Sequence, residues 1–375
     1  MVEFSVSPQG QLQLKTLASA SIDMPPDLRD RLGHLARGDY CRQSDGSARV
    51  LDVIEEAALA SNTLADLYVK VVQDLQAKAP GVPVQAVGAH GQTIRHRPAS
   101  NFTLQLINGA RIAALSELPT VCDFRSADLA LGGQGAPLVP LFHQDALGSK
   151  NECRLILNLG GIANLSLLDG DRVRGFDTGP ASTLLDAWAL KHLGQAYDRS
   201  GAWATSGTNS ERLLEHFLAE PFFALPAPKS TGRELFSLAW LEDKLAQFSP
   251  VEQLSARDIQ ATLSQLTARS IAQAAQRALT GAYSSGAERK EIAVYACGGG
   301  VKNIQLMGDI QAAFTSLLGT PLKLRMTSEL GIDPQQMEAS AFAWLAWKRW
   351  GQQPLNFCPV TGSRRPHIAG ALYMP

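Results

Sequence analysis

The sequence places one carboxylate, Asp177, where it could do chemistry. Asp177 lies in GFDTGP, at the end of an apolar stretch expected to be a strand and just before a Gly-Pro turn into an expected helix. A carboxylate at a strand end that faces a cleft can act as a general base or hold Mg²⁺. The alternative is an aspartate that caps the next helix by accepting hydrogen bonds from its amides. On this segment alone the catalytic and the capping role of Asp177 are equally well supported.

Hydrogen-bonding side chains gather in two segments that follow expected strands. His90, Gln92 and Thr93 lie in AHGQTIRHRP, residues 89–98, and Arg125 lies in DFRSAD. Such a density of polar groups suits recognition of a polyhydroxylated or anionic ligand, and an arginine can hold a carboxylate with two hydrogen bonds. Arg125 could instead form an internal salt bridge with a neighbouring aspartate. A zinc site at the histidines lacks further ligands at a suitable spacing.

Other charged residues leave a structural and a functional interpretation open. Arg95 and Arg97 could form a solvated face, while Lys229 and Arg233 in PKSTGRE could touch phosphate or belong to a basic loop. Glu338 begins the expected helix MEASAFAWLAWKRW, where the positive end of the helix dipole favours an acid in any case. Taken alone, Glu338 is therefore best explained by the helix.

Two glycine-rich turns could bind phosphate through backbone amides. Gly160 and Gly161 lie in NLGGIAN between two apolar stretches, and glycine lets amides approach an anion closely. A tight hairpin is the alternative. The residues 297–303, CGGGVKN, end an expected strand and open an expected helix, where helix amides can meet a nucleotide. They match neither G-x-G-x-x-G nor a P-loop, and close packing at the helix start is the alternative.

The composition limits the classes of partner and compartment. The 375 residues contain 34 Lys and Arg against 35 Asp and Glu, a net charge of -1, so no overall field favours nucleic acid or an anionic membrane. The five cysteines are scattered and form no C-x-x-C pair, which argues against disulfides or structural zinc. The sequence contains neither a run of roughly 20 apolar residues nor a signal peptide. We expect a cytoplasmic protein without nucleic-acid or membrane partners.

Hydrophobic periodicity predicts a mixed α/β protein of two domains. We expect a hairpin over residues 2–21, a three-stranded meander over 154–179, and a strand, glycine turn and helix over 291–314. A polar stretch near residue 148 indicates domains 1–148 and 149–375, and the last helix could pack back on the first domain. Each domain should be a sheet flanked by helices, with a cleft between them. Further short strands are expected at 84–90, 102–107 and 120–124, and helices at 24–38, 47–78, 181–194, 209–219 and 258–279.

Eight motifs follow one another in a characteristic order. They are AHGQTIRH, DFRSADLALGGQGAPLVPLFH, LNLGGIANLSLL, GFDTGPASTLLDAW, DRSGAW, PKSTGRE, ACGGGVKN and GIDPQQMEASAFAWLA. In series they resemble the motifs of the anhydro-N-acetylmuramic acid kinase family, from about residue 85 to the C-terminal AGALY. Several motifs are weak alone, but their order is highly specific.

The resemblance implies a two-domain actin-like ATPase fold of ribonuclease H-like type, with ATP and Mg²⁺ in the cleft and a homodimer as a further possibility. It implies that 1,6-anhydro-N-acetylmuramic acid, ATP and water give N-acetylmuramic acid 6-phosphate and ADP, in peptidoglycan recycling. Asp177 would be the base that activates water. The resemblance assigns the sugar to His90, Gln92, Thr93, Arg125 and Glu338, and the nucleotide to Gly160, Gly161, Gly298, Gly299, Gly300 and Asn303.

One family element has no counterpart in this sequence. Members of the family begin with a strand, a loop of the form M-S-G-T-S-x-D-G-x-D and a second strand, whereas MVEFSV resembles only the tail of that second strand. The loop would supply groups to the phosphates and the metal, so we expect weak turnover and lower stability. Our hypothesis is a misassigned start codon or a truncation. The alternatives are a catalytically impaired or inactive sugar-binding homologue and an actin-like kinase for another sugar.

Overall fold

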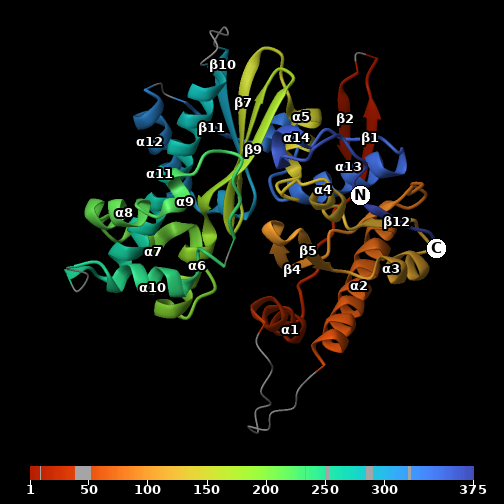
Figure 1. Ribbon diagram of the computed structural model, residues 1–375, viewed down its shortest axis with the longest axis horizontal. Helices are drawn as coiled ribbons and strands as arrows, with labels where there is room; N and C mark the ends of the chain where they lie inside the picture. The colour runs from red at the N-terminus through yellow and green to blue at the C-terminus, as the bar shows by residue number, and fades with distance from the viewer. Residues whose placement is uncertain (9, 39–51, 233, 250–252, 284–289, 320–321) are drawn as a thin grey trace. The chain divides into compact units, whose positions relative to one another are not determined.

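The computed structural model describes all residues of the chain except 9, 39–51, 233, 250–252, 284–289 and 320–321. The chain forms two compact units, each of helices and strands (Figure 1). Unit 1 comprises Met1–Ala146 and Ala339–Pro375, and unit 2 comprises Leu147–Glu338. The first division lies close to the boundary expected at residue 148. The C-terminal segment from residue 339 onward, which contains most of the helix that could pack back on the first domain, clusters with unit 1.

Unit 2 is built on one five-stranded mixed sheet. The strands β7 (Glu152–Leu159), β8 (Ile162–Asp169) and β9 (Arg172–Pro180) form the predicted antiparallel meander. β10 (Glu291–Cys297) pairs parallel with β7, and β11 (Leu324–Met326) pairs parallel with β10. The resulting order, β11-β10-β7-β8-β9, is that of a ribonuclease H-like sheet. The predicted mixed α/β class is therefore confirmed.

Helices pack on this sheet and complete a large apolar core. The long helix α11 (Ala256–Tyr283) packs against β8 and β9 and contacts α6 (Ser182–Leu193), α8 and α12. Small residues such as Ala268 and Ala272 are fully buried on α11, so its backbone can approach its neighbours closely. The remaining elements of unit 2 among the described residues are η2 (Arg199–Gly201), α7 (Ala202–Thr205), α8 (Glu211–Leu218), α9 (Pro221–Ala224), α10 (Leu238–Ala246), η4 (Gly299–Lys302), α12 (Ile304–Leu318) and η5 (Thr327–Leu330).

The strands of unit 1 form smaller sheets. β1 (Val2–Val6) and β2 (Leu12–Thr16) make the predicted hairpin. β6 (Thr120–Cys122) pairs parallel with β3 (Val87–Gly88) and antiparallel with β12 (Ala371–Tyr373). The last strand of the chain thus completes a sheet whose other strands come from the first third of the sequence.

A second antiparallel pair in unit 1 carries the polar segment 89–98. This segment was expected to follow a strand, but most of it is a strand itself, β4 (Gln92–Arg97), paired with β5 (Phe102–Leu106). The register shifts between Thr93 and Arg95, and Ile94 between them is buried. One buried side chain is enough to fix which face of so short a strand turns inward.

The helices of unit 1 begin and end at recognisable sequence signals. Asp52 caps α2 (Val53–Lys78), because its Oδ1 accepts hydrogen bonds from the amides of Ile54 and Glu55. α1 (Pro26–Arg37) has proline in its first turn and ends at Gly38, whose φ is 79°. The other helical elements are η1 (Pro98–Ser100), α3 (Gly109–Ser116), α4 (Ser126–Ala130), α5 (Val139–Leu147), α13 (Met337–Trp350) and α14 (Cys358–Thr361).

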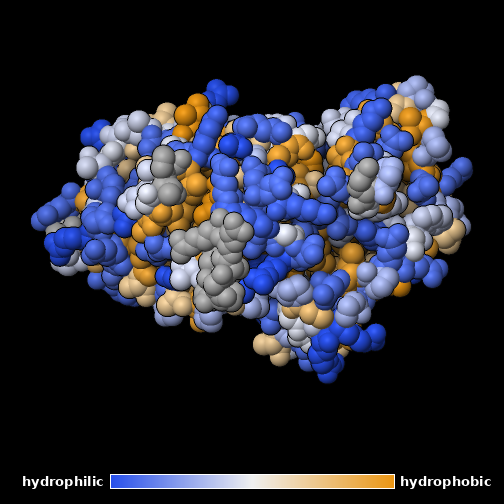
Figure 2. All heavy atoms as spheres, turned by 90° about the horizontal axis from the view of Figure 1, so that it is seen from above, coloured by the Kyte–Doolittle hydropathy of each residue, from blue (hydrophilic) through white to orange (hydrophobic). Residues whose placement is uncertain are grey.

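The surface is mainly hydrophilic on the face shown in Figure 2, where hydrophobic side chains appear in several separate areas. Single exposed apolar residues are normal on protein surfaces. Among the residues that the structure describes, none of the helices combines the length and the apolar character that crossing a membrane requires.

Candidate active site

Asp177 is buried at the C-terminal part of β9, where it pairs with Asn164 of β8. Its Oδ2 accepts hydrogen bonds from Ser230 Oγ at 3.0 Å and from the Thr231 amide at 2.9 Å, and its own amide donates to the Lys229 carbonyl. The alternative role as a helix cap is not what the structure has, because the N-cap of α6 is Ala181 and makes no side-chain cap. The carboxylate is instead held by the loop that precedes α10.

Ser230 and Thr231 were missed by the sequence reasoning, which considered only the basic residues of PKSTGRE. Two hydrogen bonds to one oxygen fix the plane of a carboxylate and favour its ionised form. A hydroxyl residue followed by another in a loop is too common to indicate such a contact. Nothing local in the sequence links this loop to a strand that ends 50 residues earlier.

The turn at Gly160 and Gly161 joins β7 to β8 and is tied to the start of α6. The Gly161 carbonyl accepts hydrogen bonds from the amides of Ala181 and Thr183, and the Gly160 carbonyl accepts one from the amide of Ser182. The first amides of α6 are therefore used to hold the turn. A ligand at this turn would have to meet the amide side of the glycines.

Gly298, Gly299 and Gly300 follow β10 and pack against the end of β7. A Cβ at Gly298 would lie 2.5 Å from Asn158 Oδ1, and one at Gly300 would lie 2.7 Å from the Leu159 Cβ. The predicted alternative of close packing thus explains these two glycines. Gly299 is exposed, with open space where a Cβ would stand. The structure brings this turn and the turn after β7 together at the C-terminal ends of two parallel strands, the edge at which ligands of α/β sheets bind.

Asn303 and Glu338 flank this region. Asn303 is the N-cap of α12, since its Oδ1 accepts from the Leu306 amide at 3.0 Å. Burial, followed by the nearby Glu338 charge, raises the pKa of the Cys297 thiol to about 12. Glu338 is exposed in the first turn of α13. Its charge acts on Cys297, the last residue of β10, so Glu338 lies near the end of that strand. The predicted nucleotide residue Asn303 has a structural task, and Glu338 stands beside the glycine turn.

In unit 1, His90 and Arg125 are held together. The Arg125 guanidinium meets His90 Nε2 at 3.1 Å from Nε and 2.9 Å from Nη2, and its Nη1 donates to the Gly135 carbonyl at 2.7 Å. The centroid of the His90 ring lies 4.3 Å from the centroid of the Phe342 ring. Burial, and then the Arg125 charge, lower the pKa of His90 to about 3. His90 is therefore a neutral acceptor, and the motifs HGQT, DFRSAD and GGQGAP meet at Arg125.

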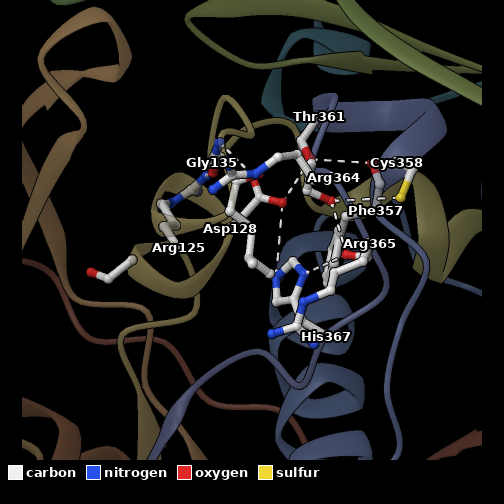
Figure 3. A network of polar contacts seen from close by, with 12 residues as sticks. Arg125, Asp128, Gly135, Phe357, Cys358, Thr361, Arg364, Arg365 and His367 are labelled. Atoms are coloured by element: carbon white, nitrogen blue, oxygen red, sulfur yellow. Dashed lines mark hydrogen bonds and ion pairs between the residues drawn. The ribbon is translucent and has the colours of Figure 1, made fainter.

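A buried aspartate fixes the loop that carries Gly135 (Figure 3). Asp128 is fully buried, and its carboxylate accepts hydrogen bonds from the Gly135 amide and from Thr361 Oγ1, both at 2.7 Å. His367 Nε2 lies 3.8 Å from the same carboxylate. The C-terminal segment thus supports the glycine loop, and through Gly135 it supports Arg125.

The remaining residues of segment 89–98 differ in their surroundings. Gln92 is exposed, and Thr93 accepts a hydrogen bond at Oγ1 from Gln105 Nε2. Arg95 donates to the carbonyls of Leu35 and Ala36 at the end of α1, so it has a structural task. Arg97 is exposed.

The structure assembles the candidate residues within each unit. Asp177 meets the loop 229–231 and the two glycine turns meet each other in unit 2, while His90 and Arg125 meet in unit 1. Within the described part of the chain, acidic, histidine and cysteine residues form no cluster that could hold a metal ion. Arg233 and Cys41 lie outside the described residues.

Comparison with known proteins gives one family. The family model described as anhydro-N-acetylmuramic acid kinase matches residues 2–375. A protein of that name from Bordetella avium strain 197N is 45% identical, over 95% of this chain and 88% of its own length. Those from Burkholderia lata and Bordetella petrii are 42% and 44% identical, over 95% and 96% of this chain and 88% and 89% of theirs.

Solved structures of other families are only distantly similar. The activator of the 2-hydroxyisocaproyl-CoA dehydratase from Clostridium difficile has a TM-score of 0.36 and 12% identity, over 75% of this chain and 81% of its own. That likeness is weak, and the ribonuclease H-like assignment rests on the strand order of unit 2. The match along residues 2–375, together with relatives above 40% identity over most of their length, establishes that the chain belongs to the anhydro-N-acetylmuramic acid kinase family.

Proposed function

We propose that the protein uses ATP and water to convert 1,6-anhydro-N-acetylmuramic acid into N-acetylmuramic acid 6-phosphate and ADP, with Asp177 as the general base. In this reaction the water oxygen bonds to C1, the C1–O6 bond breaks, and O6 takes the γ-phosphoryl group. The proton of the water passes to the Asp177 carboxylate. The observation that carries the proposal is the carboxylate held in one orientation at the end of β9 by Ser230 and Thr231.

A fixed carboxylate is the form that such a reaction needs. A general base must be placed within hydrogen-bond reach of the proton it removes, and an ionised carboxylate can only accept. Both donors on Oδ2 stabilise that ionised form. Burial of the group also limits competing hydrogen bonds from bulk water.

The two glycine turns of unit 2 are proposed to hold the nucleotide. ATP would supply the phosphoryl group, and Mg²⁺ would neutralise the charge of the phosphates. The amides of Gly160, Gly161 and Gly299 would donate hydrogen bonds to these phosphates. The chemistry of the site suits this role, because both turns end parallel strands and Gly299 faces open space. Gly298 and Gly300 would act by letting the turn pack on β7.

The sugar is proposed to meet His90, Gln92, Thr93, Arg125 and Glu338. Arg125 and Glu338 would provide charge-assisted hydrogen bonds, while neutral His90 would help to orient Arg125. We place the reaction in peptidoglycan recycling in the cytoplasm, in a protein that could be a homodimer. The relatives reported above all carry the kinase name, and none favours an inactive sugar-binding protein.

The test is a kinase assay with the purified chain, ATP and Mg²⁺ in ¹⁸O-labelled water. We expect a singly phosphorylated product with the label at C1 and ADP in equal amount. Asp177→Asn should lower kcat by about 100- to 10,000-fold, the usual contribution of a general base. Asp171→Asn, in the exposed turn between β8 and β9, is the matched control and should retain activity. Full activity of Asp177→Asn would contradict the proposed role.

A further inference from the structure

Lys229 is fixed by both its side chain and its backbone beside the donors to Asp177. Its Nζ donates to the carbonyls of Phe222 at 2.9 Å and Phe223 at 3.3 Å, near the end of α9, and lies 4.3 Å from the centroid of the Phe222 ring. Carbonyl groups and an aromatic face both attract a cation. Its own carbonyl accepts the hydrogen bond of the Asp177 amide at 3.0 Å.

The residues after Lys229 in the chain are the donors to the Asp177 carboxylate. Ser230 and Thr231 contribute the hydroxyl and the amide that hold Oδ2. Consecutive Cα atoms are only about 3.8 Å apart, so a shift at residue 229 reaches both donors. The attachment of the lysine to α9 therefore sets where the carboxylate can be held.

We propose that Lys229 is a positioning residue for Asp177, whose ammonium group fastens the segment 229–231 to α9 and thereby orients the carboxylate. The inference rests on the proposed role of Asp177 as base. Lys229 itself touches neither substrate nor reacting atom in this proposal. It acts through Ser230 and Thr231.

The charges around the ammonium make its contribution sensitive to pH. Burial, and then the charge of the nearby Arg277, lower the pKa of Lys229, while the Asp177 carboxylate raises it, and the net result is a pKa of about 8. Arg277 of α11 also donates to the Phe223 carbonyl, so two cations share this acceptor. Loss of the proton as pH rises through about 8 leaves an amine with fewer and weaker donor contacts. Activity should fall on the alkaline side.

Stability should respond in the opposite direction. Because the pKa of Lys229 in the folded protein lies below its ordinary value of 10.5, the unfolded state binds more protons between about pH 8 and 10.5. This group therefore makes unfolding less favourable as pH rises through that window. If Lys229 were merely structural, activity would change with pH in the same direction as stability. If Lys229 positions Asp177, activity should fall as pH rises through this window, while the contribution of Lys229 to stability rises.

The experiment compares kcat, the KM for the sugar and the pH profile of Lys229→Met and Lys229→Arg with those of the wild type. We expect Lys229→Met to lower kcat by about 10- to 100-fold with little change in KM, as misplacement of a catalytic group does. Lys229→Arg stays charged at every pH tested, so its alkaline limb near pH 8 should disappear. Lys191→Met, which removes another lysine that contacts an aromatic ring and pairs with Glu242, is the matched control.

The readout that separates this inference from the proposed function is the pKa of Lys229, measured by NMR of its ε-carbon. In Asp177→Asn the pKa should fall, because the carboxylate that raises it has lost its charge. An unchanged pKa would overturn the inference, as would a Lys229→Arg profile with the wild-type alkaline limb. Normal turnover of Asp177→Asn would instead refute the proposed role of Asp177 as the general base. A normal kcat and profile in Lys229→Met, with Asp177→Asn inactive, would refute only the lysine's role.

Discussion

The two units hold their candidate residues in different ways. In unit 2 a continuous five-stranded sheet carries Asp177 and both glycine turns, and its apolar core runs from the strands into α11 and α12. In unit 1 the strands form three separate sheets, and His90 and Arg125 are held by side chains and by the loop at Gly135. Backbone ladders thus position the candidate catalytic residue in unit 2, while a buried polar network positions the candidate sugar residues His90 and Arg125 in unit 1.

Acid should distinguish the units most strongly. In unit 1, burial and the Arg125 charge lower the pKa of His90 to about 3, and burial lowers that of His143 to about 3. Both pKa values in the folded protein lie below the ordinary histidine value of 6.5, so the unfolded state binds more protons and stability falls as pH drops from about 6.5 towards 3. At pH 4.5 each histidine should cost about 2 to 3 kcal/mol.

The measurement is urea unfolding followed by peptide-resolved hydrogen exchange at pH 7.5 and 4.5. Peptides of unit 1 should lose protection at lower urea in acid, and peptides of unit 2 should change less. His143→Leu should remove part of that dependence. Equal acid sensitivity of the two units would contradict the expected role of the buried histidines in unit 1.

A methyl group at one glycine should damage unit 2 next most strongly. Gly298→Ala places a Cβ 2.5 Å from Asn158 Oδ1 and 2.7 Å from the Leu159 carbonyl, at a φ of +87°. Overpacking and backbone strain together should cost about 3 kcal/mol in the free energy of unfolding of unit 2. Gly299→Ala meets nothing within 4 Å and is the control, with an expected change below about 1 kcal/mol. Similar costs for both variants would argue against close packing as the reason for Gly298.

The smallest effect is expected from removing one donor to Asp128 in unit 1. Thr361→Val deletes the hydroxyl that donates to the buried carboxylate at 2.7 Å, which should destabilise unit 1 by about 1.5 to 3 kcal/mol. Chemical denaturation with probes in unit 1 would measure it. Thr280→Val, at an exposed site of α11 whose hydroxyl donates to the Gln276 carbonyl, should change stability by less than about 0.5 kcal/mol. A neutral Thr361→Val would mean that the network does not hold the loop.

The sequence predicted best those parts of the fold that local patterns determine. The meander over β7, β8 and β9 and the strand, turn and helix at β10 and α12 follow from periodicity and turn residues, and the structure confirms them. The strand character of 92–97 was missed, because a polar strand with one buried residue gives little alternation. Asn303 three residues before Leu306 also fits a helix cap, a signal that the nucleotide interpretation passed over.

Tertiary contacts decided what local patterns could not. Residues 339–375 join unit 1 through contacts such as the pairing of β12 with β6, which no periodicity indicates. The donors to Asp177 from 230 and 231, and the contact of His90 with Arg125, likewise join segments far apart in sequence. The motifs named the candidate segments, but not the partner of each side chain.

The return of the C-terminal segment to unit 1 bears on how the protein is made. During synthesis from the N-terminus, every residue of unit 2 is added to the chain before β12 exists. Unit 2 can then fold as a continuous stretch of chain. In unit 1, by contrast, β6 can pair with Leu372 and the His90 ring can pack on Phe342 only after those later residues have been synthesised. Unit 1 should therefore complete its folding after unit 2, and a chain that ends at residue 338 should already protect β7 and β10 from protease.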